Sequence, residues 1–188
     1  KKIVLISDAG SPLISDPGYK LINFCIKSNI RVISIPGPSS IIPALQISGM
    51  PINEFYFAGF LPKTKNDIIK FFKKIKEINK TSVFFVSSHK VSTCLNFLEA
   101  EMGDRTVSIS KEITKINEKT FRGLVSKIKD EISDKPKNLK GEFVIVVQEK
   151  SIKNSQNLSL EKYKLEINRL LQKFSLTDVV EIVHKLTG

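Results

Sequence analysis

The segment Ser7-Asp8-Ala9-Gly10-Ser11-Pro12-Leu13-Ile14-Ser15-Asp16-Pro17-Gly18 carries more structural information than any other part of this chain. It follows the apolar run Ile3–Ile6 and precedes Tyr19–Ile26, whose apolar residues recur at helical spacing. This order predicts a buried strand, a loop shaped by glycine and proline, and a helix packed on a sheet. In open α/β sheets, ligands bind at the carboxyl ends of strands, so the loop is a candidate ligand site. The alternative is an ordinary strand-to-helix connection.

A second loop of the same kind follows one strand later. Residues 31–35 (Arg-Val-Ile-Ser-Ile) predict a strand, Pro36-Gly37-Pro38-Ser39-Ser40 a turn, and residues 41–48 a helix that Gly49 can end. The two serines of the turn are natural helix caps, and they also suit a bound ligand. Two loops on successive parallel strands face the same sheet edge, so the sequence predicts one cradle made by both.

The rest of the chain alternates between helical and strand patterns, which predicts a second α/β domain with a mixed sheet. A turn at Gly59-Phe60-Leu61-Pro62 marks its start. The expected helices are 65–78, 91–102 and 124–132, and the expected strands are 81–86, 106–110, a short one near 120–121, and 142–147.

A polar stretch at 151–157 reads as a linker, and apolar residues at helical spacing then predict two helices, at 160–174 and 176–186. We expect three parts: residues 1–50, 51–150 and 151–188. A helix-turn-helix DNA reader is a weaker interpretation of the last part, because the second helix has no basic exposed face.

Composition limits the function classes. The chain has 188 residues, 41% of them hydrophobic, and a formal net charge of +11, which favours polyanionic partners such as nucleic acid. A lysine-rich proteome is the alternative explanation. Lysine greatly outnumbers arginine, so phosphate contact is a better expectation than base readout. No apolar run approaches the roughly 20 residues that span a bilayer. Cys25 and Cys94 lie among apolar residues, which predicts buried thiols in a reducing cytoplasm, and no Cys/His spacing indicates a metal site.

Several motifs together resemble the ribosomal RNA small-subunit methyltransferase I family, of the tetrapyrrole-methylase-like (class III) methyltransferases. The resemblance rests on the segments 8–18, 36–40 and 59–62, followed in order by Lys111-Glu112-Ile113-Thr114-Lys115, Glu118, Arg122-Gly123 and Lys140-Gly141-Glu142-Phe143-Val144-Ile145-Val146-Val147. It implies a two-domain fold with an N-terminal parallel sheet, present here in part, a second α/β domain and C-terminal helices. It also implies that the chain is an N-terminally truncated piece that lacks part of its cofactor pocket and need not be active alone.

The resemblance further implies a reaction. Family members use S-adenosylmethionine to methylate the ribose 2′-hydroxyl of a cytidine in small-subunit ribosomal RNA, or in the assembled subunit, and are commonly dimers. The cofactor would be held by the two loops and by positions of the second domain. The expected cofactor-binding residues are Asp8, Ala9, Gly10, Ser11, Ser40, Ile41, Ala44, Phe85 and Gly141.

Some of these positions also have a plainer interpretation. Asp8 alone could form an Asx-turn, and Gly141 could provide a bend. Asp16 is expected to cap the helix that follows it.

Substrate and catalytic residues are expected in the second domain. The RNA-binding candidates are Lys90, Lys111, Thr114, Lys115 and Arg122, and the candidates for proton removal are His89, Glu112 and Lys115. None is an unambiguous base, and a solvated turn with local ion pairs is the plainer interpretation of residues 111–115. The segment 85–90 departs from the family's usual Tyr-Glu-Ser-Pro-His-Arg: Val86 replaces the glutamate, Ser88 the proline and Lys90 the arginine.

Two other functions stay open at this point. The same fold methylates tetrapyrroles and other small molecules, although the basic charge and residues 111–115 favour RNA. A non-catalytic RNA-binding module is the third possibility, because the substitution at Val86 removes a carboxylate. Binding of the demethylated cofactor separates an enzyme from a module, and the identity of the methylated product separates RNA from tetrapyrrole.

Overall fold

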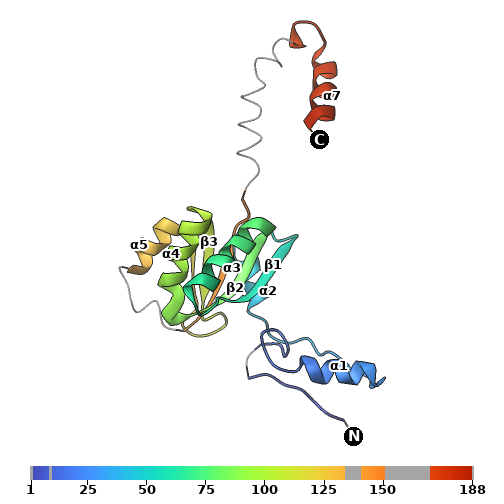
Figure 1. Ribbon diagram of the computed structural model, residues 1–188, viewed down its shortest axis with the longest axis vertical. Helices are drawn as coiled ribbons and strands as arrows, with labels where there is room; N and C mark the ends of the chain where they lie inside the picture. The colour runs from blue at the N-terminus through green and yellow to red at the C-terminus, as the bar shows by residue number, and fades with distance from the viewer. Residues whose placement is uncertain (1, 9, 134–140, 151–169, 188) are drawn as a thin grey trace. The chain divides into compact units, whose positions relative to one another are not determined.

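A computed structural model describes residues 2–8, 10–133, 141–150 and 170–187. The chain divides into two compact units, residues 1–150 and 151–188, which are described separately (Figure 1). The first unit contains a five-stranded sheet with helices on both faces. In the part of the chain that the structure describes, no helix has the length and apolar character needed to cross a membrane.

The sheet has the strand order β1-β2-β5-β3-β4. Its strands are β1 (Phe55–Phe60), β2 (Thr81–Ser87), β3 (Thr106–Lys111), β4 (Lys119–Leu124) and β5 (Glu142–Val147). β1 and β2 are parallel, whereas β5 runs antiparallel to both of its neighbours, β2 and β3, and β4 runs antiparallel to β3. The mixed sheet predicted for this part of the chain is therefore confirmed.

Three helices cover one face of the sheet (Figure 1). They are α3 (Lys65–Ile78), α4 (Val91–Met102) and α5 (Val125–Ser133), and the first two have the bounds expected from their apolar spacing. Because successive residues of a strand point to opposite faces, alternate positions of β2 and β5 supply this core. Phe84 and Ile145 are fully buried there, against Phe72 and Leu95 of the helices.

A short helix packs on the opposite face. In α2 (Ile41–Gln46), Ala44 and Leu45 are buried against Val83, Val144 and Val146, the strand positions that alternate with the first core. The helix is shorter than the expected 41–48 and ends before Gly49. Both faces of the central strands are thus apolar, as expected for a sheet between two layers of helix.

The two N-terminal strands expected at 3–6 and 31–35 do not form. Both segments lack strand structure and are exposed: Ile3 is 88% and Ile35 85% accessible. A strand is stabilised by hydrogen bonds to neighbours and by burial of a face, and two short apolar segments alone provide too little of either. The helix between them does form, as α1 (Tyr19–Lys27), but it buries none of its residues. Cys25, on this helix, is only partly buried, whereas Cys94 is buried as expected.

The strand β1 was not expected, because the sequence around Gly59 and Phe60 reads as a turn. Those two residues instead end the strand, and the pairing with β2 shifts register between Phe57 and Phe60. Gly59 has φ +76°, which a bulged strand accommodates at glycine. The aromatic run Phe55-Tyr56-Phe57 is the sequence signal for this strand, since such residues favour the pleated surface.

The second unit contains α7 (Leu176–Thr187), which confirms the last predicted helix. Its start is a reciprocal cap: the Ser175 hydroxyl donates to Asp178 Oδ2 at 2.6 Å, and the Asp178 amide donates to Ser175 Oγ at 3.3 Å. The linker expected at 151–157 and most of the helix expected at 160–174 lie outside the described residues.

Candidate functional site

Most of the candidate residues of the second domain lie at one edge of the sheet. β1, β2 and β3 run in the same direction, so their carboxyl ends share an edge with the amino ends of β4 and β5. This edge carries His89 and Lys90 after β2, residues 111–119 between β3 and β4, and Gly141 before β5. Topology therefore brings together candidates that are far apart in sequence.

The two N-terminal loops meet. The Ser11 hydroxyl donates to the carbonyl oxygen of Pro38 at 3.3 Å, which joins the first loop to the Pro-Gly-Pro turn. Among the described residues, and leaving aside the chain neighbours, a Cβ on Gly10 would meet only that same carbonyl oxygen, 4.0 Å away, and a Cβ on Gly37 would meet nothing within 4 Å. Both glycines thus present backbone to open space. Among the candidates here, Ala9 lies outside the described residues, and Asp8 is exposed.

Asp16 does not cap α1, contrary to expectation. The residue at the helix N-cap position is Gly18, and no side chain bonds the free amides there. The Asp16 carboxylate instead accepts a hydrogen bond from the Ser7 hydroxyl, which links the two ends of the first loop. Gly18, at φ +130°, lies against the Leu5 and Leu13 side chains, so the sharp turn that leads into the helix places the carboxylate elsewhere.

Around α2 the candidates differ in accessibility. Ser40 occupies the N-cap position without a side-chain bond to the helix, and Ile41 is partly buried. Ala44 is fully buried against the sheet, so its side chain packs in the core. Phe85 on β2 is partly buried and contacts the ring of Phe60 with 5.0 Å between centroids.

Beyond β2 the chain forms a single 3₁₀ turn, Ser88–Lys90. His89 is exposed on it, and Lys90 donates from Nζ to the carbonyl oxygen of Pro62 at 3.0 Å. The preceding Val86, which replaces the glutamate of the family pattern, is 2% exposed and belongs to the core beneath α3 and α4. An apolar side chain suits that position, because an unpaired carboxylate there would be costly to bury.

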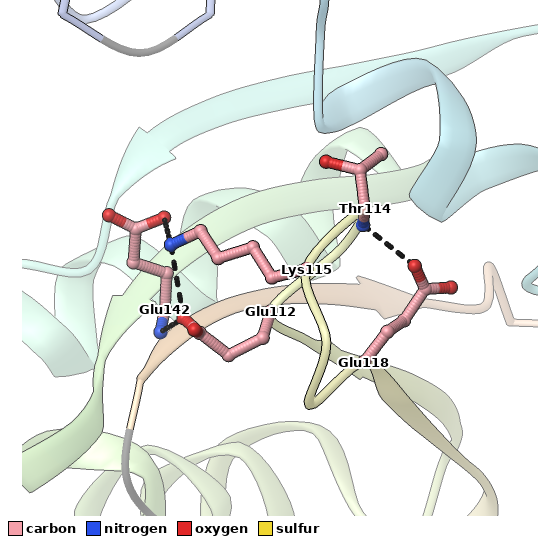
Figure 2. Close-up of polar contacts among 5 residues, drawn as sticks. All are labelled: Glu112, Thr114, Lys115, Glu118 and Glu142. Atoms are coloured by element: carbon pink, nitrogen blue, oxygen red, sulfur yellow. Dashed lines mark hydrogen bonds and ion pairs between the residues drawn. The ribbon is translucent and has the colours of Figure 1, made fainter.

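Figure 2 shows an ion-pair network in the loop between β3 and β4. Lys115 Nζ lies 3.2 Å from Glu112 Oε1 and 3.0 Å from Glu142 Oε2, so one ammonium is shared by two carboxylates. In the same loop, the backbone amide of Thr114 donates to Glu118 Oε2 at 2.7 Å. Glu112 and Thr114 both have left-handed backbone, with φ of 50° and 67°, which gives the loop its tight shape.

Glu112 is also tied to the start of β5. Its Oε1 accepts a hydrogen bond from the Glu142 amide at 2.8 Å, and the Glu112 amide donates to the Glu142 carbonyl at 2.9 Å. A Cβ on Gly141 would lie 2.6 Å from the Glu112 Cγ, so the absence of a side chain at 141 leaves the space that the glutamate fills. The Glu112 side chain thus lies directly over Gly141.

These contacts shift two pKa values in opposite directions. The Glu142 amide, followed by the Lys115 ammonium, holds the pKa of Glu112 below its ordinary value. The carboxylates of Glu142 and Glu112 raise the pKa of Lys115. At neutral pH the network therefore keeps Lys115 protonated, with no free lone pair to accept a proton. It leaves Glu112 an ionised carboxylate whose basicity is reduced by the lowered pKa.

Arg122 lies away from this network. On β4, it pairs across the sheet with Ser108 of β3, and its Nε donates to the carbonyl oxygen of Ile47 at 2.6 Å. Lys111, the last residue of β3, is partly buried and pairs with Lys119. Sequence reasoning missed Glu142 as a partner of Lys115 and assigned no role to Glu118. The adjacency of Glu142 to Gly141 was the available signal for the first.

Comparisons with known proteins agree on a family. Residues 1–129 match the family model described as Tetrapyrrole (Corrin/Porphyrin) Methylases. A protein of Thermotoga maritima named Ribosomal RNA small subunit methyltransferase I is 41% identical over 80% of this chain and 66% of its own length. A protein of Rickettsia prowazekii with the same name is 33% identical over 97% of this chain and 70% of its own length.

Solved structures support the same fold at low sequence identity. Diphthine synthase superposes with a TM-score of 0.55 at 13% identity, over 74% of this chain and 57% of that one. The methyltransferase CobJ gives 0.51 at 13% identity, over 74% of this chain and 62% of that one. These two likenesses establish architecture alone.

The chain spans about two thirds of the length of the Thermotoga and Rickettsia relatives, and 55% of a third relative with the same name, from Xylella fastidiosa. The family model covers more than half of the chain, and the identity to the Rickettsia protein extends over nearly all of it. The resemblance carried by the loop motifs is therefore confirmed, and the chain belongs to the ribosomal RNA small subunit methyltransferase I family of tetrapyrrole methylases.

Proposed function

We propose that this chain is part of a cytoplasmic enzyme that transfers a methyl group from S-adenosylmethionine to the ribose 2′-hydroxyl of a cytidine in small-subunit ribosomal RNA. The names of its relatives support the RNA substrate, and the methylase fold supports the methyl donor. The observation that carries the proposal is the hydrogen bond from Ser11 to Pro38, because it brings the two candidate cofactor loops together.

The residues of these loops fit a sulfonium nucleotide. Gly10 and Gly37 leave open space above their backbone, so a ligand can approach the peptide groups closely. Asp8 and Ser11 add polar side chains beside them, and Ser40 and Ile41 border the same turn. When bound, the cofactor supplies an already activated methyl group, and the part left to the protein is alignment of donor and acceptor.

The sheet edge is proposed to hold the RNA. Lys90, Lys111 and Lys115 are the cations proposed to contact phosphate there, with Lys115 between the carboxylates of Glu112 and Glu142, and the net charge of +11 attracts a polyanion from a distance. Thr114 adds a hydroxyl at the same edge. Arg122, on β4, is proposed to contact the RNA outside this edge. A homodimer, as in the family resemblance, would extend this basic surface.

Removal of the hydroxyl proton needs a base or solvent. Of the three candidates, Lys115 is kept protonated by Glu142 and Glu112, and Glu112 is a weakened base because the Glu142 amide and Lys115 lower its pKa. His89 is exposed at the edge, and the described residues show no hydrogen bond from its side chain that would fix the ring. We therefore assign the proton-accepting role to His89 within the proposal.

The test uses the full-length protein. Calorimetry with S-adenosylhomocysteine measures cofactor binding, and ribose-sensitive primer extension on small-subunit particles maps any methylated nucleotide. Gly10→Ala is expected to weaken cofactor binding by roughly tenfold or more, because a methyl group enters the proposed contact surface. Gly49→Ala is the matched control: it has φ +74° against +75° at Gly10 and open space around it.

Three outcomes would overturn the proposal in different ways. Methylation of a tetrapyrrole alone would replace the substrate. RNA binding without any S-adenosylhomocysteine binding would leave a non-catalytic module. Equal effects of Gly10→Ala and Gly49→Ala would show that backbone strain, and not a ligand, explains the glycine in the first loop.

A further inference from the structure

The Glu112 side chain helps to anchor the loop between β3 and β4 to the start of β5. Glu112 Oε1 accepts from both the Glu142 amide and the Lys115 ammonium, at 2.8 and 3.2 Å (Figure 2). The backbone closes the same junction, since Glu112 donates to the Glu142 carbonyl and Lys115 donates to the Glu112 carbonyl, each at 2.9 Å. One carboxylate oxygen thus links the loop, the strand and the ammonium group.

The Glu112 side chain needs open space at Gly141, the residue directly before β5. A Cβ there would lie 2.6–2.7 Å from Cγ, Cδ and Oε1 of Glu112, closer than real side-chain contacts allow. Any larger residue at 141 would displace the glutamate. Glycine at 141 is therefore explained by the side chain that lies over it, and a bound ligand is not needed to account for it.

A second carboxylate, that of Glu142, also binds the Lys115 ammonium. Glu142 Oε2 lies 3.0 Å from Lys115 Nζ, so the ammonium is bound by two carboxylates. A free lysine side chain samples many rotamers, and ordering it on binding costs conformational entropy. Because Glu112 and Glu142 already restrict the Lys115 side chain in the free protein, less of this freedom is lost when a ligand binds the ammonium.

We infer that Glu112 and Glu142 are positioning residues that hold Lys115 as an oriented cation for a phosphate of the RNA substrate, and that Gly141 leaves the space that the Glu112 side chain needs. This inference rests on the proposed function. It gives Glu112 no part in proton transfer, because the group serves through the lysine that it orients. It also removes Gly141 from the residues that contact the cofactor.

The variants are compared in the full-length protein with small-subunit particles as substrate. Lys115→Met and Glu112→Ala are each expected to raise KM by roughly tenfold with little change in kcat, because binding of the phosphate is lost. The double variant is expected to be no worse than either single one, since both act through one contact. Glu112→Gln keeps an oxygen acceptor for the Glu142 amide and the lysine, and it is expected to recover most of the lost affinity.

The glycine provides a second, matched pair. Gly141→Ala is expected to raise KM as Glu112→Ala does. Gly103→Ala, at φ +80° and with no atom within 4 Å of the added Cβ, is expected to behave as the wild type. Equal behaviour of the two alanine variants would overturn the role given to Gly141.

The opposite result at Glu112 is equally informative. A loss of roughly 10²-fold or more in kcat for Glu112→Gln, with KM unchanged, would identify a proton-transfer role and overturn the inference. An unchanged KM for Lys115→Met would show that the lysine contacts no phosphate and would also overturn it.

Hydrogen exchange separates this inference from the proposed function. In the free protein, the amides of residues 111–119 are expected to exchange faster in Glu112→Ala and Gly141→Ala, but not in Glu112→Gln or Gly103→Ala. This readout needs no activity. If the wild type methylates no small-subunit particle, the proposed function fails, while unchanged exchange in Glu112→Ala would overturn the positioning role itself.

Discussion

Arg122 Nε donates to the carbonyl oxygen of Ile47 across 2.6 Å, and this bond joins two residues 75 positions apart in the chain. Ile47 follows the last turn of α2, where carbonyl groups lack partners within the helix. Arg122 belongs to β4, the strand at the opposite edge of the sheet from β1. The bond therefore ties the short helix after the second loop to an edge strand of the sheet.

Removing this tie should loosen α2. Arg122→Ala is expected to lower the free energy of unfolding by about 1 kcal/mol, because one charge-assisted hydrogen bond is lost at an exposed position. Urea unfolding followed by circular dichroism measures the change. Arg31→Ala, an exposed arginine in the segment before the second loop, serves as the control. An Arg122→Ala protein as stable as this control would show that the bond contributes nothing to the docking of α2.

The aromatic cluster between α3 and β2 should dominate the stability of the first unit. Phe84 is fully buried, and its ring lies 5.2 Å from Phe71 and 6.0 Å from Phe72 between centroids. Phe84→Ala is expected to cost about 3–5 kcal/mol of unfolding free energy through lost burial and a residual cavity. Phe24→Ala, at a position 62% exposed on α1, is expected to change it by less than about 0.5 kcal/mol. Comparable losses for the two would contradict the assigned core.

Acid should weaken the start of α5 through one carboxylate. Asp104 accepts from the Ser126 amide at 2.9 Å and from the Ser126 hydroxyl at 2.7 Å, and these two donors hold its pKa below the ordinary value. Because the folded pKa lies below the unfolded one, the stabilisation is present above about pH 4 and is lost as the pH falls through the folded pKa.

Asp104→Asn is therefore expected to have a lower Tm than the wild type at pH 6. The difference is expected to shrink as the pH falls below about 4 and through the folded pKa of Asp104. Thermal unfolding at a series of pH values measures the difference. Ser126→Ala, which removes the hydroxyl donor but keeps the amide, should give an intermediate effect. A difference between Asp104→Asn and the wild type that stays constant with pH would contradict the assignment.

The two cysteines should differ in reactivity. Burial raises the pKa of the Cys94 thiol, whereas Cys25 is only partly buried on α1. The thiolate is the reactive form, so a disulfide reagent is expected to label Cys25 roughly tenfold faster or more in the native protein. The time course of labelling with Ellman's reagent measures this. Cys25→Ser should abolish the fast phase, and a fast phase that survives in this variant would show that Cys94 is accessible.

Local patterns predicted the elements that carry their own signal. Residues 65–78 place apolar side chains on one helical face, and Thr64 caps the helix by accepting from the Asp67 amide, so both bounds follow from nearby residues. The strand 142–147 is a continuous apolar run and forms with those bounds. The segments 3–6 and 31–35 carry the same apolar signal, yet they form no strand, because pairing depends on neighbours that a local pattern does not specify.

The sequence predicted most of the residues that belong to the candidate site, but not which of them contact one another. Motif resemblance pointed to the two loops, to residues 111–115 and to Gly141, and topology brings the last two groups to one edge. The contact of Glu112 with Gly141 and Glu142 joins positions about 30 residues apart, and it depends on the antiparallel pairing of β3 with β5. No spacing rule for a single helix or strand reveals such a contact.

The place of β5 has a consequence for biosynthesis. The last strand to be made lies in the centre of the sheet, with β2 on one side and β3 on the other. Until Val147 has been translated, the other four described strands form a parallel pair and a hairpin, which have no ladder in common. Completion of the sheet therefore waits for synthesis of this final strand, and a premature stop before it would leave two separate halves with exposed edges.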